Sequence, residues 1–141
     1  MDPKELLPHR EPFLLVDEIS EIVPGISARG SWTLKGDEWF FPGHFPGRPT
    51  LPGVLMVESL AQVGASAVLS DARYQSKLPL FGGIERARFR RQVVPGDRLD
   101  LEVTVTKLSA RAGKGQGRAT IDGALACEAD LLFVIVDSAE T

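Results

Sequence analysis

The sequence is poor in the residues that build disulfides and metal centres. Its 141 residues include one cysteine, Cys127, and two histidines, His9 and His44. A single cysteine excludes a disulfide within the chain and is typical of a protein of the reducing cytosol. Cys127 has no basic neighbour and is interpreted as a small buried apolar residue. So few histidines and cysteines do not make a zinc site, and we expect no metal.

Long apolar runs and an excess of positive charge are missing as well. No apolar run approaches the ~20 residues that cross a bilayer, and the start, MDPKELLPHR, lacks the pattern of a signal peptide. The formal net charge of −3 gives no general attraction for nucleic acid. These features predict a cytoplasmic protein that binds neither membranes nor nucleic acids. No repeat or linker is visible, so residues 1–141 are expected to form one domain.

Hydrophobic patterning predicts a mixed α+β domain. Residues 54–70 are apolar or small on nearly all faces, which indicates one long buried helix. About six strands are expected around it, over residues 13–23, 26–34, 80–92, 99–106, 114–121 and 124–136. A curved sheet around a single helix would bury that helix on most sides. We also expect a type II turn at residues 94–97, and close backbone packing or a hairpin at Gly113, Gly115 and Gly117.

Glu58 is the only ionisable residue between Gly53 and Ser70. Burying a carboxylate is costly, and such a group often keeps its proton near neutral pH, where it can act as a general acid. A buried Glu can instead be a structural partner for Arg, but no Arg or Lys lies within one helical turn of Glu58. Gln62 lies four residues later on the same helix face, where its amide could orient the carboxyl group.

The loop PGHFPGRPTLPG, residues 42–53, brings two further groups to the start of this helix. Prolines restrict the backbone around His44, so the loop could present a general base, although a lone histidine more often only hydrogen-bonds within a turn. The first N–H groups of the helix, at Gly53, lack intrahelical acceptors and could polarise a carbonyl oxygen. A base, an acid and an oxyanion donor suit loss of an α proton and a β-hydroxyl beside a carbonyl. His9 is interpreted as a structural or surface residue.

Ordered motifs cover nearly the whole chain. They are LPHR (7–10), PFLLVD (12–17), FPGHFP (41–46), PGVLMVE (52–58), LAQ (60–62), FRR (89–91), PGD (95–97) and IDG (121–123). Together they closely resemble the β-hydroxyacyl-acyl-carrier-protein dehydratases of bacterial type II fatty-acid synthesis. The departures are small: Glu11 stands where the family usually has an aromatic residue, and Ala87-Arg88 replaces a pair that usually ends in Lys.

The resemblance implies a hot-dog fold, with a curved antiparallel sheet wrapped around the helix. It implies that His44 is the catalytic base and Glu58 the acid, while the Gly53 N–H binds the thioester carbonyl and Gln62 orients Glu58. It also implies a homodimer with shared active sites, assembled as a trimer of dimers. The implied reaction converts (3R)-hydroxyacyl-acyl-carrier-protein to the trans-2-enoyl form, with no cofactor beyond the carrier's phosphopantetheine. Glu58, where a related dehydratase/isomerase branch typically has Asp, favours the plain dehydratase.

The acidic carrier protein could dock on a basic stripe. Arg86, Arg88 and Arg90 alternate along a predicted strand with Arg91 beside them, although a solvated edge strand has the same pattern. Two other functions stay open. One is an acyl-thioester hydrolase in which Glu58 activates water. The other is a non-catalytic module that binds acyl thioesters.

Overall fold

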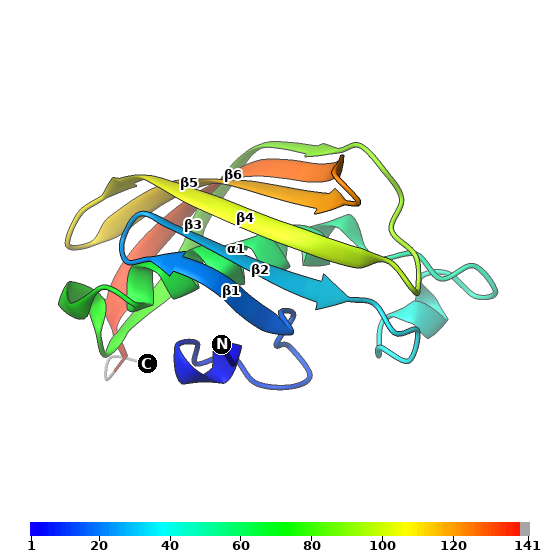
Figure 1. Ribbon diagram of the computed structural model, residues 1–141, viewed down its shortest axis with the longest axis horizontal. Helices are drawn as coiled ribbons and strands as arrows, with labels where there is room; N and C mark the ends of the chain where they lie inside the picture. The colour runs from blue at the N-terminus through cyan, green and yellow to red at the C-terminus, as the bar shows by residue number, and fades with distance from the viewer. Residues whose placement is uncertain (139–141) are drawn as a thin grey trace.

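One long helix lies against a face of a six-stranded antiparallel sheet in the computed structural model, which describes residues 1–138 (Figure 1). The helix α1 spans Gly53–Leu69. The strands are β1 (Glu18–Val23), β2 (Ser27–Thr33), β3 (Lys77–Phe89), β4 (Arg98–Leu108), β5 (Ala112–Ile121) and β6 (Ala124–Asp137). Short 3₁₀ helices are η1 (Pro3–Glu5), η2 (Phe41–Gly43) and η3 (Ala72–Tyr74). The strand order β1-β2-β4-β5-β6-β3 leaves β1 and β3 at the edges.

The central helix is buried on nearly all sides, as its sequence predicts. Fourteen of its 17 residues are buried. Glycines let the sheet approach closely, because a Cβ on Gly117 of β5 would lie 3.2 Å from the Leu60 side chain, and one on Gly64 would lie 3.0 Å from the Phe133 ring. The predicted close backbone packing of the β5 glycines is confirmed. The sheet curved around one helix is the expected α+β hot-dog fold.

The predicted first strand, residues 13–23, is too long at its N-terminal end, since β1 begins at Glu18. The reason is that the Gln62 side chain takes the backbone hydrogen bonds that a neighbouring strand would otherwise make. The Leu15 N–H donates to Gln62 Oε1 at 2.8 Å, and Gln62 Nε2 donates to the Phe13 carbonyl at 2.8 Å. Because the Gln62 amide takes these backbone groups, the segment runs beside α1 instead of joining the sheet.

Strand β3 begins three residues earlier and ends three residues earlier than the predicted strand 80–92. It includes Pro79, which an edge strand accommodates because one side of its backbone needs no partner. The predicted type II turn is confirmed: the Asp97 N–H donates to the Val94 carbonyl at 3.1 Å, and Gly96 has a φ of +95°.

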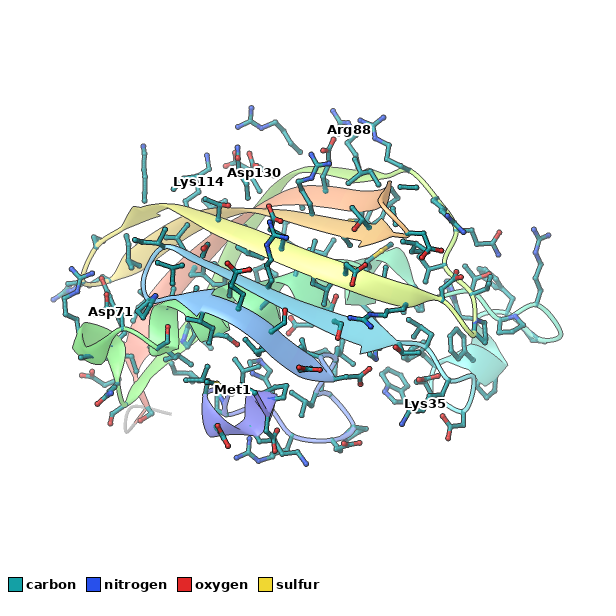
Figure 2. All side chains as sticks on the ribbon, viewed as in Figure 1. Met1, Lys35, Asp71, Arg88, Lys114 and Asp130 are labelled. Atoms are coloured by element: carbon teal, nitrogen blue, oxygen red, sulfur yellow. The ribbon has the colours of Figure 1, made fainter. Side chains whose placement is uncertain are left out.

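The outer face of the sheet carries a row of alternating charges that crosses all six strands. In strand order, the residues opposite one another are Glu21, Arg29, Glu102, Arg118, Glu128 and Arg88. The Arg29–Glu102 pair is the closest in the row, at 2.7 Å. Figure 2 shows Arg88, with Lys114 and Asp130, on the side of the sheet away from α1. Opposite charges on facing positions stabilise strand pairing by roughly 0.2–1 kcal/mol each.

No helix among residues 1–138 is long and apolar enough to cross a membrane.

Candidate active site

His44 is held by the loop in one tautomer. The loop closes on itself through the Thr50 N–H, which donates to the His44 carbonyl at 2.8 Å. The His44 Nδ1 lies 2.7 Å from the Thr50 carbonyl, which can only accept, so Nδ1 carries the ring proton. The Phe45 ring stacks on the imidazole with centroids 4.0 Å apart. This leaves the Nε2 lone pair available to take a proton.

The start of α1 shares a pocket of about 560 Å³ with His44. Gly53 lines it, and no acceptor for the Gly53 N–H occurs among residues 1–138. The Phe89 ring lies over this glycine so closely that a Cβ on Gly53 would be 2.7 Å from the ring. A helix N-terminus with free N–H groups beside an imidazole can bind a carbonyl oxygen while a neighbouring carbon loses its proton.

Glu58 lies on α1 in a mostly buried position. Its side chain is 18% exposed, and its Oε2 accepts a hydrogen bond from Gln62 Nε2 at 3.0 Å. Burial raises the pKa of Glu58, and the Gln62 hydrogen bond offsets part of this rise. Gln62 is fully buried and is itself fixed by the backbone of Phe13 and Leu15. Glu58 is thus an oriented carboxyl group, and burial moves its pKa in the direction that a general acid requires.

Within the described chain, His44 and Glu58 do not share a pocket. Met56 lines the His44 pocket, and Glu58 follows two residues later, which is about 200° around the helix. The structure of one chain therefore brings His44 together with Gly53, and Glu58 together with Gln62, but leaves the two pairs on different sides of α1.

His9, for which the sequence predicts a structural or surface role, lies beside Glu58. His9 Nε2 lies 3.8 Å from Glu58 Oε2, and the His9 side chain is 24% exposed. Its Nδ1 is buried and has no hydrogen-bond partner among residues 1–138. Burial lowers the pKa of His9, and the charge of Arg10 lowers it further. The LPHR motif contains His9, but nothing in its spacing indicates that it folds onto the helix.

Residues 7–130 match the family model of the FabA-like domain. The chain belongs to the FabA-like family. It is 55% identical over 135 residues to a 3-hydroxyacyl-[acyl-carrier-protein] dehydratase FabZ of Moorella thermoacetica. The alignment covers 96% of this chain and 94% of that protein. A protein of the same name from Clostridium botulinum is 53% identical over 132 residues, covering 94% and 92%.

Solved structures share the fold of this FabA-like chain at low identity. The dehydratase heterocomplex ApeI:P from Xenorhabdus doucetiae aligns with a TM-score of 0.80 and 19% identity over 99% of this chain and 94% of its own. Cj0977, a sigma28-regulated virulence protein from Campylobacter jejuni, aligns with a TM-score of 0.71 and 15% identity, covering 96% and 87%.

The four arginines of the expected basic stripe lie in different surroundings in this FabA-like chain. Arg86 pairs with the buried Asp130 at 2.8 Å, and Arg90 pairs with Glu128 at 3.2 Å. Arg88 is exposed on the outer face. Arg90 and Arg91 line the pocket that contains His44. Of these four arginines, the two at the candidate site therefore come from the segment that follows β3.

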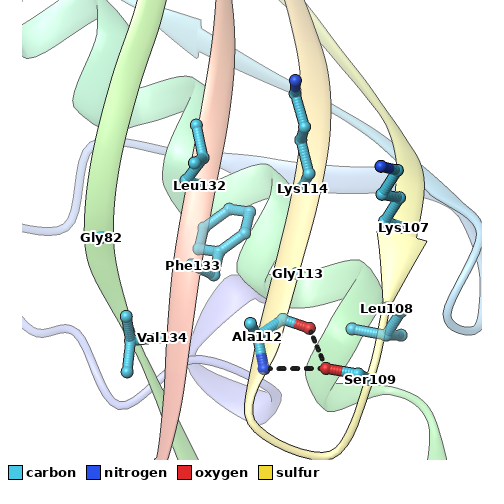
Figure 3. Close-up of a pocket in the computed structure, with 10 residues that line it drawn as sticks. All are labelled: Gly82, Lys107, Leu108, Ser109, Ala112, Gly113, Lys114, Leu132, Phe133 and Val134. Carbon is cyan, nitrogen blue, oxygen red and sulfur yellow. Dashed lines mark hydrogen bonds between the residues drawn. The ribbon is translucent and has the colours of Figure 1, made fainter.

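A second pocket, of about 490 Å³, lies at the other end of the sheet beside the β4–β5 hairpin (Figure 3). Leu108, Leu132 and Phe133 line it, and Ser109 closes the hairpin by donating to the Ala112 carbonyl at 3.2 Å. The expected site residues do not line this second pocket.

Other reactive groups of the FabA-like chain are buried or scattered. Burial, with a smaller effect of Glu128, raises the pKa of the Cys127 thiol to about 11, which keeps it protonated. No cluster of three or more His, Cys, Asp or Glu residues that could hold a metal ion occurs within residues 1–138.

Proposed function

We propose that this protein removes water from a 3-hydroxyacyl-acyl-carrier-protein to give the trans-2-enoyl form, as a step of fatty-acid synthesis. The observation that carries the proposal is the His44 imidazole, whose free Nε2 lies in one pocket with an open helix N-terminus at Gly53. The relatives at 53–55% identity are named for this reaction. A base beside an oxyanion donor suits removal of a proton α to a thioester.

The proposed step moves two protons and breaks one carbon–oxygen bond. His44 Nε2 takes the α proton while the Gly53 N–H binds the thioester oxygen, on which negative charge develops. Glu58 gives its proton to the departing β-hydroxyl, which leaves as water as the double bond forms. Glu58 ends as a carboxylate and His44 as an imidazolium, and return of the proton resets the site. The scheme uses no metal and no nucleotide.

We further propose that the base and the acid of one site come from two chains. The approximately opposite directions of Met56 and Glu58 on α1 leave His44 without an acid in its own chain. Edge strand β3 is 13 residues long and exposes apolar side chains, including Leu80, Phe81 and Ile84. Such an edge favours pairing with a second copy. In the resulting dimer, His44 would face Glu58 of the partner subunit, and dimers could assemble further into trimers of dimers.

An acyl carrier protein is the proposed donor of the substrate. Arg90 and Arg91 lie at the rim of the His44 pocket, where they would meet an acidic partner as its phosphopantetheine enters. Arg86 and Arg88 lie farther along β3, and Arg86 already pairs with Asp130. Docking by Arg90 and Arg91 therefore has the stronger support.

The test is to incubate the purified protein with 3-hydroxybutyryl-acyl-carrier-protein and follow enoyl formation by absorbance and mass. Loss of one water by the wild type is expected, with His44→Ala slower by about 10²–10⁴-fold. Lys114→Ala, on the outer face of β5, is the control that should keep wild-type turnover. Free carrier thiol without enoyl product would instead indicate a thioesterase, and binding without conversion would indicate an acyl-binding module.

A further inference from the structure

The segment around His9 packs against the central helix, and the Arg10 guanidinium hydrogen-bonds to its backbone. Leu7 is buried and clusters with Ala65 and Leu69 of α1. Arg10 Nη1 donates to the carbonyls of Leu7 at 2.8 Å and of His9 at 2.7 Å. These contacts fix the backbone around His9 next to the helix that carries Glu58.

One oxygen of Glu58 lies between two nitrogen groups. Glu58 Oε2 accepts from Gln62 Nε2 at 3.0 Å and lies 3.8 Å from His9 Nε2. The second distance exceeds a hydrogen bond, but in a partly buried site a charge on the imidazole would act strongly on the carboxyl group at this range. The protonation state of His9 therefore bears directly on the acid.

The surroundings of His9 favour the neutral form of its imidazole. Burial and the neighbouring Arg10 both oppose its protonation. Arg10 gives Nη1 hydrogen bonds to backbone carbonyls, and Gln62 contributes a neutral amide from α1. A cation beside Glu58 would stabilise the carboxylate and weaken the acid, whereas a neutral ring leaves the proton on Glu58.

We propose that His9 is a positioning residue for Glu58: its uncharged imidazole packs 3.8 Å from Oε2 and leaves the proton on the carboxyl group until the substrate hydroxyl departs. The role rests on the proposed dehydration. In that step the proton passes from Glu58 to the leaving oxygen as the carbon–oxygen bond breaks, and His9 neither gains nor loses a proton.

The test compares His9→Lys with His9→Gln in the full-length protein. Lysine places a permanent charge beside Glu58, so the alkaline limb of the kcat–pH profile should move to lower pH and kcat near neutral pH should fall about ten- to hundredfold. Glutamine keeps a neutral polar group and should retain most of kcat. Glu11→Gln also raises the net charge by one, by removing a negative charge from an exposed neighbour, and should leave the profile unchanged.

A second readout needs no substrate. The Glu58 carboxyl carbon can be titrated by ¹³C NMR and assigned by its loss in Glu58→Gln. In His9→Lys this titration should move to lower pH. Unchanged Glu58 titration and unchanged kcat–pH profiles in both variants would overturn the role of His9. Failure of the wild type to dehydrate the substrate would overturn the proposed function instead, while the NMR titration would still report on His9.

Discussion

At the scale of single residues, immediate neighbours influence where the protons lie on which the proposed chemistry depends. The Thr50 carbonyl fixes the proton of His44 on Nδ1, and burial favours the neutral form of Glu58. Sequence reasoning reaches both residues, because a lone carboxylate in an apolar helix and a histidine in a proline-rich loop stand out. It does not reach His9, since the contact between residues 9 and 58 depends on how the N-terminal segment folds onto the helix.

Because Glu58 is buried, the free energy of unfolding should fall as the pH rises. Its folded-state pKa is raised, so the folded chain holds this proton more tightly than the unfolded chain. The contribution is complete below the ordinary Glu pKa of about 4.3 and is lost as pH rises through the folded-state value. Glu58→Gln removes this loss. Urea unfolding at fixed protein concentration should show Glu58→Gln gaining stability over the wild type from acidic to neutral pH. A difference that does not change with pH would contradict this account.

Gln62→Ala should destabilise the fold, and it should also remove the hydrogen bond that orients Glu58. The Gln62 amide satisfies Leu15, Phe13 and Glu58 together, and its loss leaves buried polar groups without partners. The bond to Leu15 is buried, whereas the bonds to Phe13 and Glu58 are only partly buried, so water can replace them in part. With about 1–3 kcal/mol for the buried group and less for each of the other two, a loss of roughly 2–5 kcal/mol in the free energy of unfolding is expected. The control is Ser66→Ala, which removes the single hydrogen bond that the Ser66 hydroxyl donates to the Gln62 carbonyl and should cost about 1 kcal/mol. Equal effects of the two substitutions would argue against the role of Gln62.

At the scale of elements, patterning predicts the number and kind of elements better than their ends. The helix and six strands follow from apolar runs and alternation, which local sequence contains. The ends depend on remote partners: the strand expected from residue 13 starts at Glu18 because Gln62 takes the backbone of Phe13 and Leu15. Residues 86–88 of β3 also include a bulge, with Arg86 at a φ of +50°. Alternation of arginines alone does not reveal it.

Close backbone approach within the sheet gives a prediction for Gly30 of β2. A Cβ at this position would lie 2.6 Å from the Glu18 carbonyl oxygen, which is backbone and cannot rotate away. Gly30→Ala should therefore destabilise the protein by roughly 1–3 kcal/mol. Gly43→Ala is the matched control, because nothing lies within 4 Å of its new methyl group. Thermal unfolding of both variants measures the difference, and a Gly30→Ala variant as stable as Gly43→Ala would contradict the packing described.

At the scale of the whole molecule, one chain carries two separate groups of candidate site residues. The side of α1 that carries Met56 faces the His44 pocket, while Glu58 faces His9 and Gln62. The sequence predicts both groups, and only the resemblance implied that they belong to different chains. Helical geometry explains why spacing alone is misleading, because His44 and Glu58 are near in sequence yet lie on different sides of the helix. The long apolar edge of β3 is the surface through which a second copy would complete each site.

The most direct measurement mixes two inactive variants. His44→Ala and Glu58→Gln chains with different tags are co-refolded, the mixed oligomers are isolated through both tags, and dehydration of 3-hydroxybutyryl-acyl-carrier-protein is followed. If His44 of one subunit works with Glu58 of the other, each mixed dimer regains one intact site and about half of the wild-type turnover, while each parent alone stays inactive. Mixed oligomers as inactive as their parents, although both tags co-purify, would contradict the shared site.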